Sequence, residues 1–132
     1  MTSVIPEKFL DLLDRPLLGH LATTRPDGSP QVNPMWFLWD GTHLRFTHTS
    51  KRAKFRNVAH EPRVAMSVVD PDHPSRYLEV RGTVETVEDD PTGAFYVTLA
   101  QRYSRPPNPP ADAPDRVVLV VRPESISFQD RR

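Results

Sequence analysis

Fifteen prolines in 132 residues limit this chain to short elements of secondary structure. Proline has no backbone N–H and clashes with the preceding helical turn, so it breaks helices and is confined to the edges or irregularities of sheets. Five of the fifteen lie between Ser104 and Pro114, and this segment is expected to be an extended loop. The chain is therefore expected to fold from many short strands and a few short helices.

Between the prolines, apolar and polar residues alternate as in half-buried strands. Asp27-Gly28 and Asp40-Gly41 are strong turn signals, which predict hairpins between the first three strands. The longest alternation suggests that the fifth strand is the longest, and the continuous apolar run that follows suggests a strand buried on both faces. The predicted strands are Leu17–Thr24, Pro30–Trp39, Leu44–His48, Val64–Val69, Arg76–Val87, Val117–Val121 and Ser125–Phe128.

Three helices are predicted among these strands. The first covers Pro6–Asp14, where proline suits the first helical position, and the second follows the third strand and ends before Pro62. The third covers Pro91–Tyr103, with Asp89 or Asp90 as its cap. Six or seven mostly antiparallel strands with short helices predict a mainly β fold, a closed or partly closed barrel that protects its strand edges.

Charge and cysteine content restrict the function. The 17 basic and 17 acidic residues cancel, so neither nucleic acid nor a membrane is expected as a partner. The absence of cysteine excludes thiol chemistry, and the five histidines never fall at metal-ligand spacing, so no metal site is predicted. One domain over residues 1–132 is expected. With no spanning apolar segment and no apolar core in Met1–Lys8, the expected location is the cytoplasm.

The residues after the third predicted strand carry the strongest local signal of a binding site. Thr49 and Ser50 are good N-cap residues, and the first helical turn would then hold Lys51, Arg52 and Lys54. The helix macrodipole disfavours each such cation by roughly a few tenths of a kcal/mol unless an anion binds there. Free N–H groups, a hydroxyl and three cations would suit a phosphate or carboxylate. A solvated basic surface is the alternative, and the residues alone leave both interpretations open.

A second set of candidate residues would face the same region. Asn57, one helical turn beyond Lys54, would complete the anion site. On the second strand, Pro34 interrupts the ladder and leaves backbone groups free for a ligand. The alternative is that Met35 and Trp36 are core residues and Pro34 marks a bulge, and for Trp36 alone this alternative is favoured. The candidates on the second and third strands are Asn33, Pro34, Met35, Trp36, Thr47 and His48.

The order of these segments and their residue sequences resemble the pyridoxamine-phosphate-oxidase-like split β-barrel family. This resemblance implies an FMN-binding-protein-like split barrel. Arg52-Ala53-Lys54 followed by Asn57 is similar to the phosphate-contacting segment of the actinobacterial branch that uses the deazaflavin F420 instead of FMN. The resemblance also implies a homodimer with two cofactor sites at its interface. The chain lacks the terminal Trp and Arg-x-His-Asp-Arg stretch of true pyridoxamine phosphate oxidases, so vitamin B6 oxidation is not expected. The segments that carry the resemblance are Gly19–Thr24, Asp27–Val32, Thr49–Asn57, Asn57–Val64 and Tyr77–Val84.

The function that the resemblance implies is an F420-dependent oxidoreductase, which transfers a hydride between the deazaflavin and a small organic substrate. Tyr77, His48, Tyr103 or solvent could supply the accompanying proton, and no catalytic residue is identified. Tyr77 and Arg81 are further candidate cofactor-binding residues; Arg81 would serve a polyglutamate tail, although pairing with Glu79 is the alternative. An FMN-binding oxidoreductase and a non-catalytic cofactor or haem carrier are the alternative functions.

Overall fold

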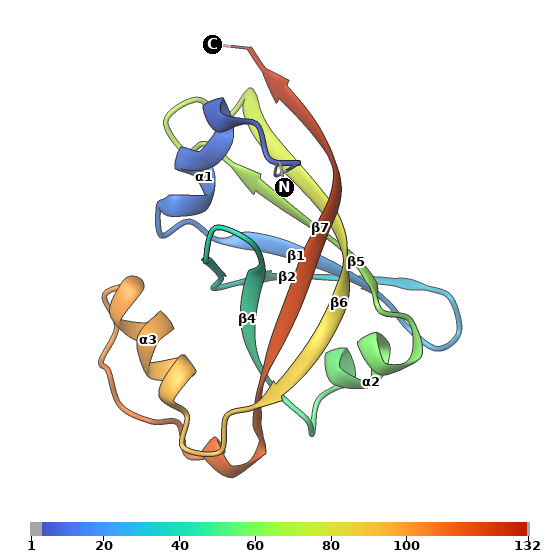
Figure 1. Cartoon of the computed structure of the whole chain (residues 1–132), viewed down its shortest axis with the longest axis vertical. Coiled ribbons are helices and arrows are strands. Elements are labelled where there is room, and N and C mark those ends of the chain that lie inside the picture. Colours follow the sequence, from blue (N-terminus) through green and yellow to red (C-terminus); the bar gives the residue numbers. More distant parts are fainter. Residues whose placement is uncertain (1–3, 132) are drawn as a thin grey trace.

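Seven strands form one antiparallel sheet within residues 4–131, the part of the chain that the computed structural model describes. Residues 1–3 and 132 of the predicted domain lie outside the described residues. The strand order is β2-β1-β5-β6-β7-β4-β3, and the twisted sheet coils around one core as a split β-barrel (Figure 1). The mainly β prediction is therefore confirmed. The strands are β1 (Gly19–Thr24), β2 (Pro30–Met35), β3 (Leu38–Trp39), β4 (Leu44–Thr49), β5 (Arg63–Val69), β6 (Arg76–Asp89) and β7 (Arg116–Asp130).

Short helices lie around the sheet and do not form a separate layer (Figure 1). They are the 3-10 helices η1 (Glu7–Phe9) and η2 (Ala113–Asp115) and the α-helices α1 (Leu10–Asp14), α2 (Ala53–His60) and α3 (Ala94–Arg102). The prediction that α3 begins at Pro91 with Asp89 or Asp90 as its cap was wrong, because the helix begins at Ala94 and its N-cap is Gly93. The carboxylate of Asp90 nevertheless accepts the N–H groups of Phe95 and Tyr96 in the first turn. Within residues 4–131, no helix is both long enough and apolar enough to cross a membrane.

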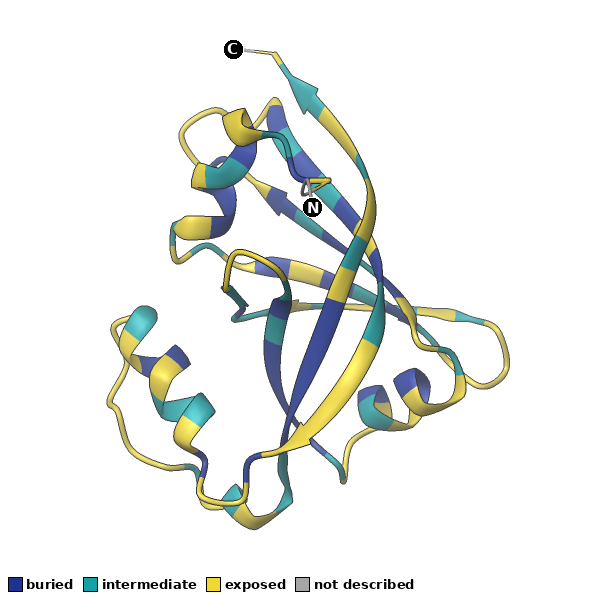
Figure 2. Cartoon of the chain, viewed as in Figure 1, coloured by how far each residue is buried: buried dark blue, intermediate teal, exposed yellow. Residues whose placement is uncertain are grey.

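The core lies inside the coiled sheet and is covered by the N-terminal helices. Phe9, Leu12, Phe37 and Phe46 are completely buried there. The segment Val117–Val121 of β7 is buried at every position, as predicted, whereas the rest of that strand is largely exposed (Figure 2).

The single strand predicted over residues 30–39 is divided at Trp36 and Phe37. The N–H of Phe37 donates to the hydroxyl of Tyr103 (3.0 Å), and its carbonyl accepts a hydrogen bond from Nε of Arg102 (3.0 Å). Side chains at the C-terminal end of α3 thus satisfy backbone groups that a continuous strand would pair with a neighbour. The prediction of one strand was wrong because these partners lie some 65 residues further along the chain.

The two C-terminal strands predicted at residues 117–121 and 125–128 are one strand, β7. With 15 residues it is longer than β6, which has 14, so the prediction of the longest strand was wrong as well. Pro123 lies opposite Gly82 at a register shift, where the ladder is relaxed and the missing proline N–H is tolerated. The two backbones approach so closely that a Cβ on Gly82 would collide with the carbonyl oxygen of Arg122.

Arg76, the first residue of β6, attaches the N-terminal helices to the sheet. Its guanidinium donates to both carboxylate oxygens of Asp11 (2.7 and 3.0 Å), to the carbonyl of Lys8 (2.6 Å) and to the carboxylate of Asp70 (3.0 Å). Arg76 and Asp70 are each 4% exposed. Burial alone would raise the pKa of Asp70, but the N–H of Asp72 and the guanidinium groups beside it hold that pKa at about 2.

Arg102, which is distant in sequence, caps the C-terminal end of α1 with its side chain. Its guanidinium donates to the carbonyls of Leu13, Asp14 and Arg15 at 2.8 to 2.9 Å, in addition to Phe37. The last carbonyls of a helix lack partners within the helix, and a cation at that end also complements the macrodipole. One side chain therefore joins α1, α3 and the break between β2 and β3.

Candidate functional site

An open groove of about 520 Å³ lies where the C-terminal ends of β2 and β4 meet the beginnings of α2 and β7. It brings together all six candidate residues of the second and third predicted strands and two of the three predicted cations. Its lining residues are Leu18, Asn33, Pro34, Met35, Trp36, Thr47, His48, Arg52, Lys54 and Arg116.

One end of the groove carries positive charge without a matching carboxylate. Lys54 is 8% exposed, and its Nζ donates to Oδ1 of Asn33 (2.7 Å). Among residues 4–131, Lys51, Arg52 and Lys54 have no ion-pair partner. Burial and then the charge of Arg52 lower the pKa of Lys54. A buried ammonium whose only hydrogen-bond partner is an amide oxygen would gain from an anion beside it.

The start of α2 differs from the prediction. The helix begins at Ala53, and neither Thr49 nor Ser50 caps it. Their hydroxyls hold the preceding turn, because that of Ser50 donates to the carbonyl of Asp115 (3.4 Å) and that of Thr49 accepts the N–H of Lys51 (3.3 Å). The first turn of α2 has no side-chain cap and no acidic residue. Its N–H groups and positive dipole end are therefore uncompensated by the chain, beside the cations described above.

An aromatic wall limits the groove on the side of α3. The indole of Trp36 stacks on Tyr103 (5.3 Å between centroids, 12° between planes) and is tilted onto Tyr96 (5.9 Å). The hydroxyl of Tyr103 donates to the carbonyl of Leu17 (2.7 Å) and accepts the N–H of Phe37, so it is engaged in holding this wall. Trp36 is partly exposed at the groove surface and does not belong to the buried core.

Two buried polar atoms in the groove wall have no hydrogen-bond partner among the described residues. They are Oγ1 of Thr47 and Nε2 of His48, whose residues are 9% and 5% exposed. Burial, and after it the charges of Lys54, Arg52 and Arg116, lower the pKa of His48 to about 4. Unsatisfied buried polar groups are rare in folded proteins, and at the edge of a groove they indicate a place for a ligand or ordered water.

Six predicted site residues lie outside the groove lining: Thr49, Ser50 and Lys51, which lie just before α2, and Asn57, Tyr77 and Arg81. Asn57 is 2% exposed, and its Nδ2 donates to Thr23 and Gln31 (3.0 Å each), which attaches α2 to the β1–β2 hairpin. Tyr77 lies on β6 opposite Gln129 of β7, remote from the register of the groove residues. Arg81 is exposed and pairs with Glu79 at 3.5 Å, the alternative that its sequence spacing suggested.

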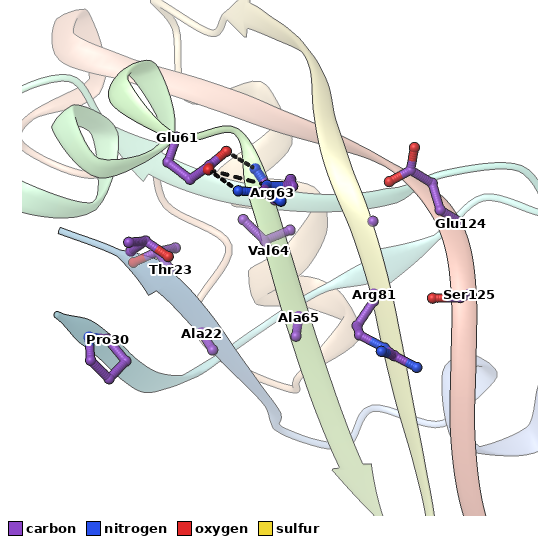
Figure 3. Close-up of a pocket in the computed structure, with 12 residues that line it drawn as sticks. Ala22, Thr23, Pro30, Glu61, Arg63, Val64, Ala65, Arg81, Glu124 and Ser125 are labelled. Atoms are coloured by element: carbon purple, nitrogen blue, oxygen red, sulfur yellow. Dashed lines mark hydrogen bonds and ion pairs between the residues drawn. The ribbon is translucent and has the colours of Figure 1, made fainter. Parts of the chain in front are cut away.

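A second hollow, of about 370 Å³, lies over the outer faces of β1, β5, β6 and β7 (Figure 3). Its charges are paired: Arg63 with Glu61 (2.6 Å), Arg81 with Glu79, and Glu124 with Arg122 (3.0 Å). It therefore lacks the uncompensated positive charge of the groove. Among residues 4–131, no three His, Cys, Asp or Glu side chains are grouped so that they could hold a metal ion.

Sequence reasoning missed Leu18 and Arg116, which also line the groove. Arg116 is paired with Asp112 (3.0 Å) and lies over the ring of Tyr96 (5.0 Å), so it connects the aromatic wall to the cationic end. Neither residue belongs to a local motif. Leu18 precedes β1, and Arg116 reaches the groove because β7 pairs with β4 in the register Thr49 to Arg116.

Fold and groove together define a small split β-barrel protein with a cation-lined surface groove. The chain belongs to the pyridoxamine 5'-phosphate oxidase family, whose sequence profile matches residues 5–130. This confirms the resemblance that the sequence suggested.

Solved structures of similar proteins support the same assignment. A structure named F420 reductase is 64% identical, with a TM-score of 0.91 over 93% of this chain and 98% of that chain. A conserved hypothetical protein of Mycobacterium tuberculosis is 25% identical, with a TM-score of 0.77 over 98% of this chain and 88% of that one. General stress protein 26 of Bacillus anthracis shares the fold at 22% identity, with a TM-score of 0.71 over 96% and 94% of the two chains.

Proposed function

We propose that this protein is an F420-dependent oxidoreductase that transfers a hydride between the deazaflavin and a small organic substrate. The observation that carries the proposal is the composition of one groove: unpaired buried positive charge, an uncapped helix start, two unpartnered polar atoms and an aromatic wall. The 64% identity to the protein named F420 reductase favours the deazaflavin over other phosphate-bearing cofactors.

The residues present fit a cofactor that has a phosphate and a flat ring. Arg52 can hold a phosphate in a bidentate manner, Lys54 adds a second charge, and the N–H groups at the start of α2 face the same end. Met35 and Trp36 offer apolar and aromatic surface for a ring. The polar atoms of Thr47 and His48 can then bond to ring substituents or to the chain that links ring and phosphate.

When bound, F420 would supply the hydride chemistry of the reaction. The protein would supply binding, orientation and exclusion of water. Trp36, stacked on Tyr103, gives the groove a rigid apolar side, and the cations fix the charged end of the ligand. A substrate would lie against the part of the groove that the ring leaves open, near Leu18 and the aromatic wall.

Direct titration of the cofactor-free protein with F420 and with FMN tests the proposal. We expect micromolar binding of F420, much weaker binding of FMN, and quenching of the fluorescence of Trp36, which lines the groove. In a Trp36→Phe variant, Trp39 remains as the internal control and the quenching should largely disappear. A preference for FMN would assign the protein to the flavin users, binding without turnover of any acceptor would make it a carrier, and binding of neither cofactor would overturn the proposal.

We propose further that two copies pair and share their cofactor sites. Edge strand β2 exposes Val32, which is 62% accessible, on the same face as Pro30 and Pro34. Leu18, which is 50% exposed, lines the groove itself. An apolar edge that continues into the groove is suited to a second copy, and covering it would also protect an unpaired strand.

Val32→Asp should convert the dimer to a monomer and weaken cofactor binding together with dimerisation. The substitution is at an exposed position, so the monomer itself should keep its thermal stability. Sedimentation velocity and cofactor titration measure the two effects. Val87→Asp, at a valine of β6 that is 40% exposed, is the matched control and should change neither. A Val32→Asp protein that is monomeric and binds cofactor at full strength would refute the shared site.

A further inference from the structure

His48 differs from the other histidines of the chain in its environment. It is 5% exposed, lines the groove, and its Nε2 has no hydrogen-bond partner among the described residues. By contrast, His43 is bonded to Glu85, and His20 and His60 are exposed to solvent. A buried imidazole without a partner is costly unless another group completes its hydrogen bonding.

Burial and the charges around His48 explain why it is neutral in the free protein. Lys54 faces it from α2, Arg52 from the position just before α2 and Arg116 from β7, and the carboxylate of Asp112 beside η2 acts in the opposite direction. Burial makes the largest contribution, and together these effects lower the pKa of His48 to about 4. At neutral pH the groove therefore has three cationic side chains and an uncharged imidazole among them.

An anion bound among these cations would counteract their effect on the pKa of His48. Its negative charge favours the protonated imidazole, so the pKa of His48 must rise when the anion binds. By reciprocity, protonation of His48 must strengthen binding of the anion by the same factor. The affinity for an anion of fixed charge should therefore rise as the pH falls from the pKa of the complex towards about 4, and level off below it.

We propose that His48 is a specificity residue for an anionic group, such as the phosphate of a cofactor, and takes up a proton when that group binds in the groove. The proposal rests on the use of the cationic end as the phosphate site. It adds to that site a fourth positive group that exists only in the complex. A ligand without an anionic group cannot induce this charge, so the imidazole discriminates between phosphorylated and unphosphorylated ligands.

Sulfate is the appropriate probe, because it keeps its double charge throughout the working pH range whereas phosphate titrates. We expect the pKa of His48, followed by proton NMR of its ring, to rise by about two units at saturating sulfate. We expect sulfate affinity to increase about tenfold between pH 7 and pH 5. The resonance is identified by its loss in His48→Gln, or by assignment of the wild-type spectrum if that variant does not fold.

His48→Gln should remove the pH dependence of sulfate affinity. His60→Gln, at the exposed last residue of α2, is the control and should retain it. An unchanged pKa of His48 at saturating sulfate, or the same pH dependence in His48→Gln, would overturn the inference. The proposed function is tested separately. If F420 or FMN binds and the pKa of His48 stays constant, only the inference fails, and if sulfate raises that pKa but neither cofactor binds, only the proposed function fails.

Discussion

Replacing Lys54 with methionine should weaken cofactor binding by roughly 5- to 100-fold, which corresponds to about 1–3 kcal/mol for a charge-assisted hydrogen bond. Lys54 is buried in the groove wall, and no carboxylate among the described residues compensates its charge. Methionine has a similar length, so the packing should persist. The Oδ1 of Asn33 also keeps a donor, Nε2 of Gln31 at 3.0 Å. The measurement is titration of F420 into wild type and variant.

The same substitution should leave the melting temperature unchanged or raise it, since an unpaired buried ammonium is unfavourable in the free protein. Loss of binding without loss of stability would distinguish a ligand-binding role from a structural one. Lys51→Met is the matched control, because Lys51 is exposed and outside the groove lining, and it should have a much smaller effect. Full-strength binding by Lys54→Met would place the phosphate elsewhere.

Arg76→Ala should lower the melting temperature by about 10 °C or more, because removal of one partner from a buried ion pair leaves the other charge uncompensated. Asp70 would keep its buried carboxylate, and α1 would lose its attachment through Asp11 and Lys8. Thermal unfolding followed by circular dichroism measures the effect. Arg122→Ala, at an exposed pair with Glu124, is the control and should change the melting temperature by no more than a degree or two.

The hydrogen bonds of Arg76 with Asp11 and Asp70, here called the Arg76 network, also determine how the stability of the folded protein depends on pH. The pKa of Asp70 is about 2 in the folded protein, below its value in an unfolded chain, so the folded state binds fewer protons between these two values. The stability from this group is complete above about pH 4 and is lost as the pH falls towards 2. In Arg76→Ala this part of the acid dependence should be reduced. An acid unfolding profile identical to that of wild type would contradict the role assigned to the network.

The strand pattern and much of the groove were predictable from the sequence because they depend on local signals. Alternation located the strands, and Asp27-Gly28 and Asp40-Gly41 marked the turns between them; both glycines have positive φ (89° and 94°). The same reasoning selected the residues from Asn33 to Trp36 and the cations after β4, which the fold places in one groove. Whether they bind a cofactor is tested by the titrations above.

What the sequence could not predict depends on partners far along the chain. The break at Phe37 is caused by Arg102 and Tyr103, and the passage of β7 through Pro123 depends on the register shift at Gly82. The hydroxyls of Thr49 and Ser50 look like helix caps in sequence, but they stabilise the preceding turn. Arg116 enters the groove only through the pairing of β4 with β7.

That pairing has a consequence for biosynthesis. All six residues of β4 are paired with β7, whereas β3 on the other side pairs with only two of them. Every other strand is translated before β7, so a nascent chain carries β4 with one long edge bare until Arg116–Asp130 has left the ribosome. The groove, whose wall includes Thr47, His48 and Arg116, can form only after β7 has been translated. A ligand that needs the complete groove can therefore bind only after this pairing has formed, and until then the bare edge of β4 can pair with another chain.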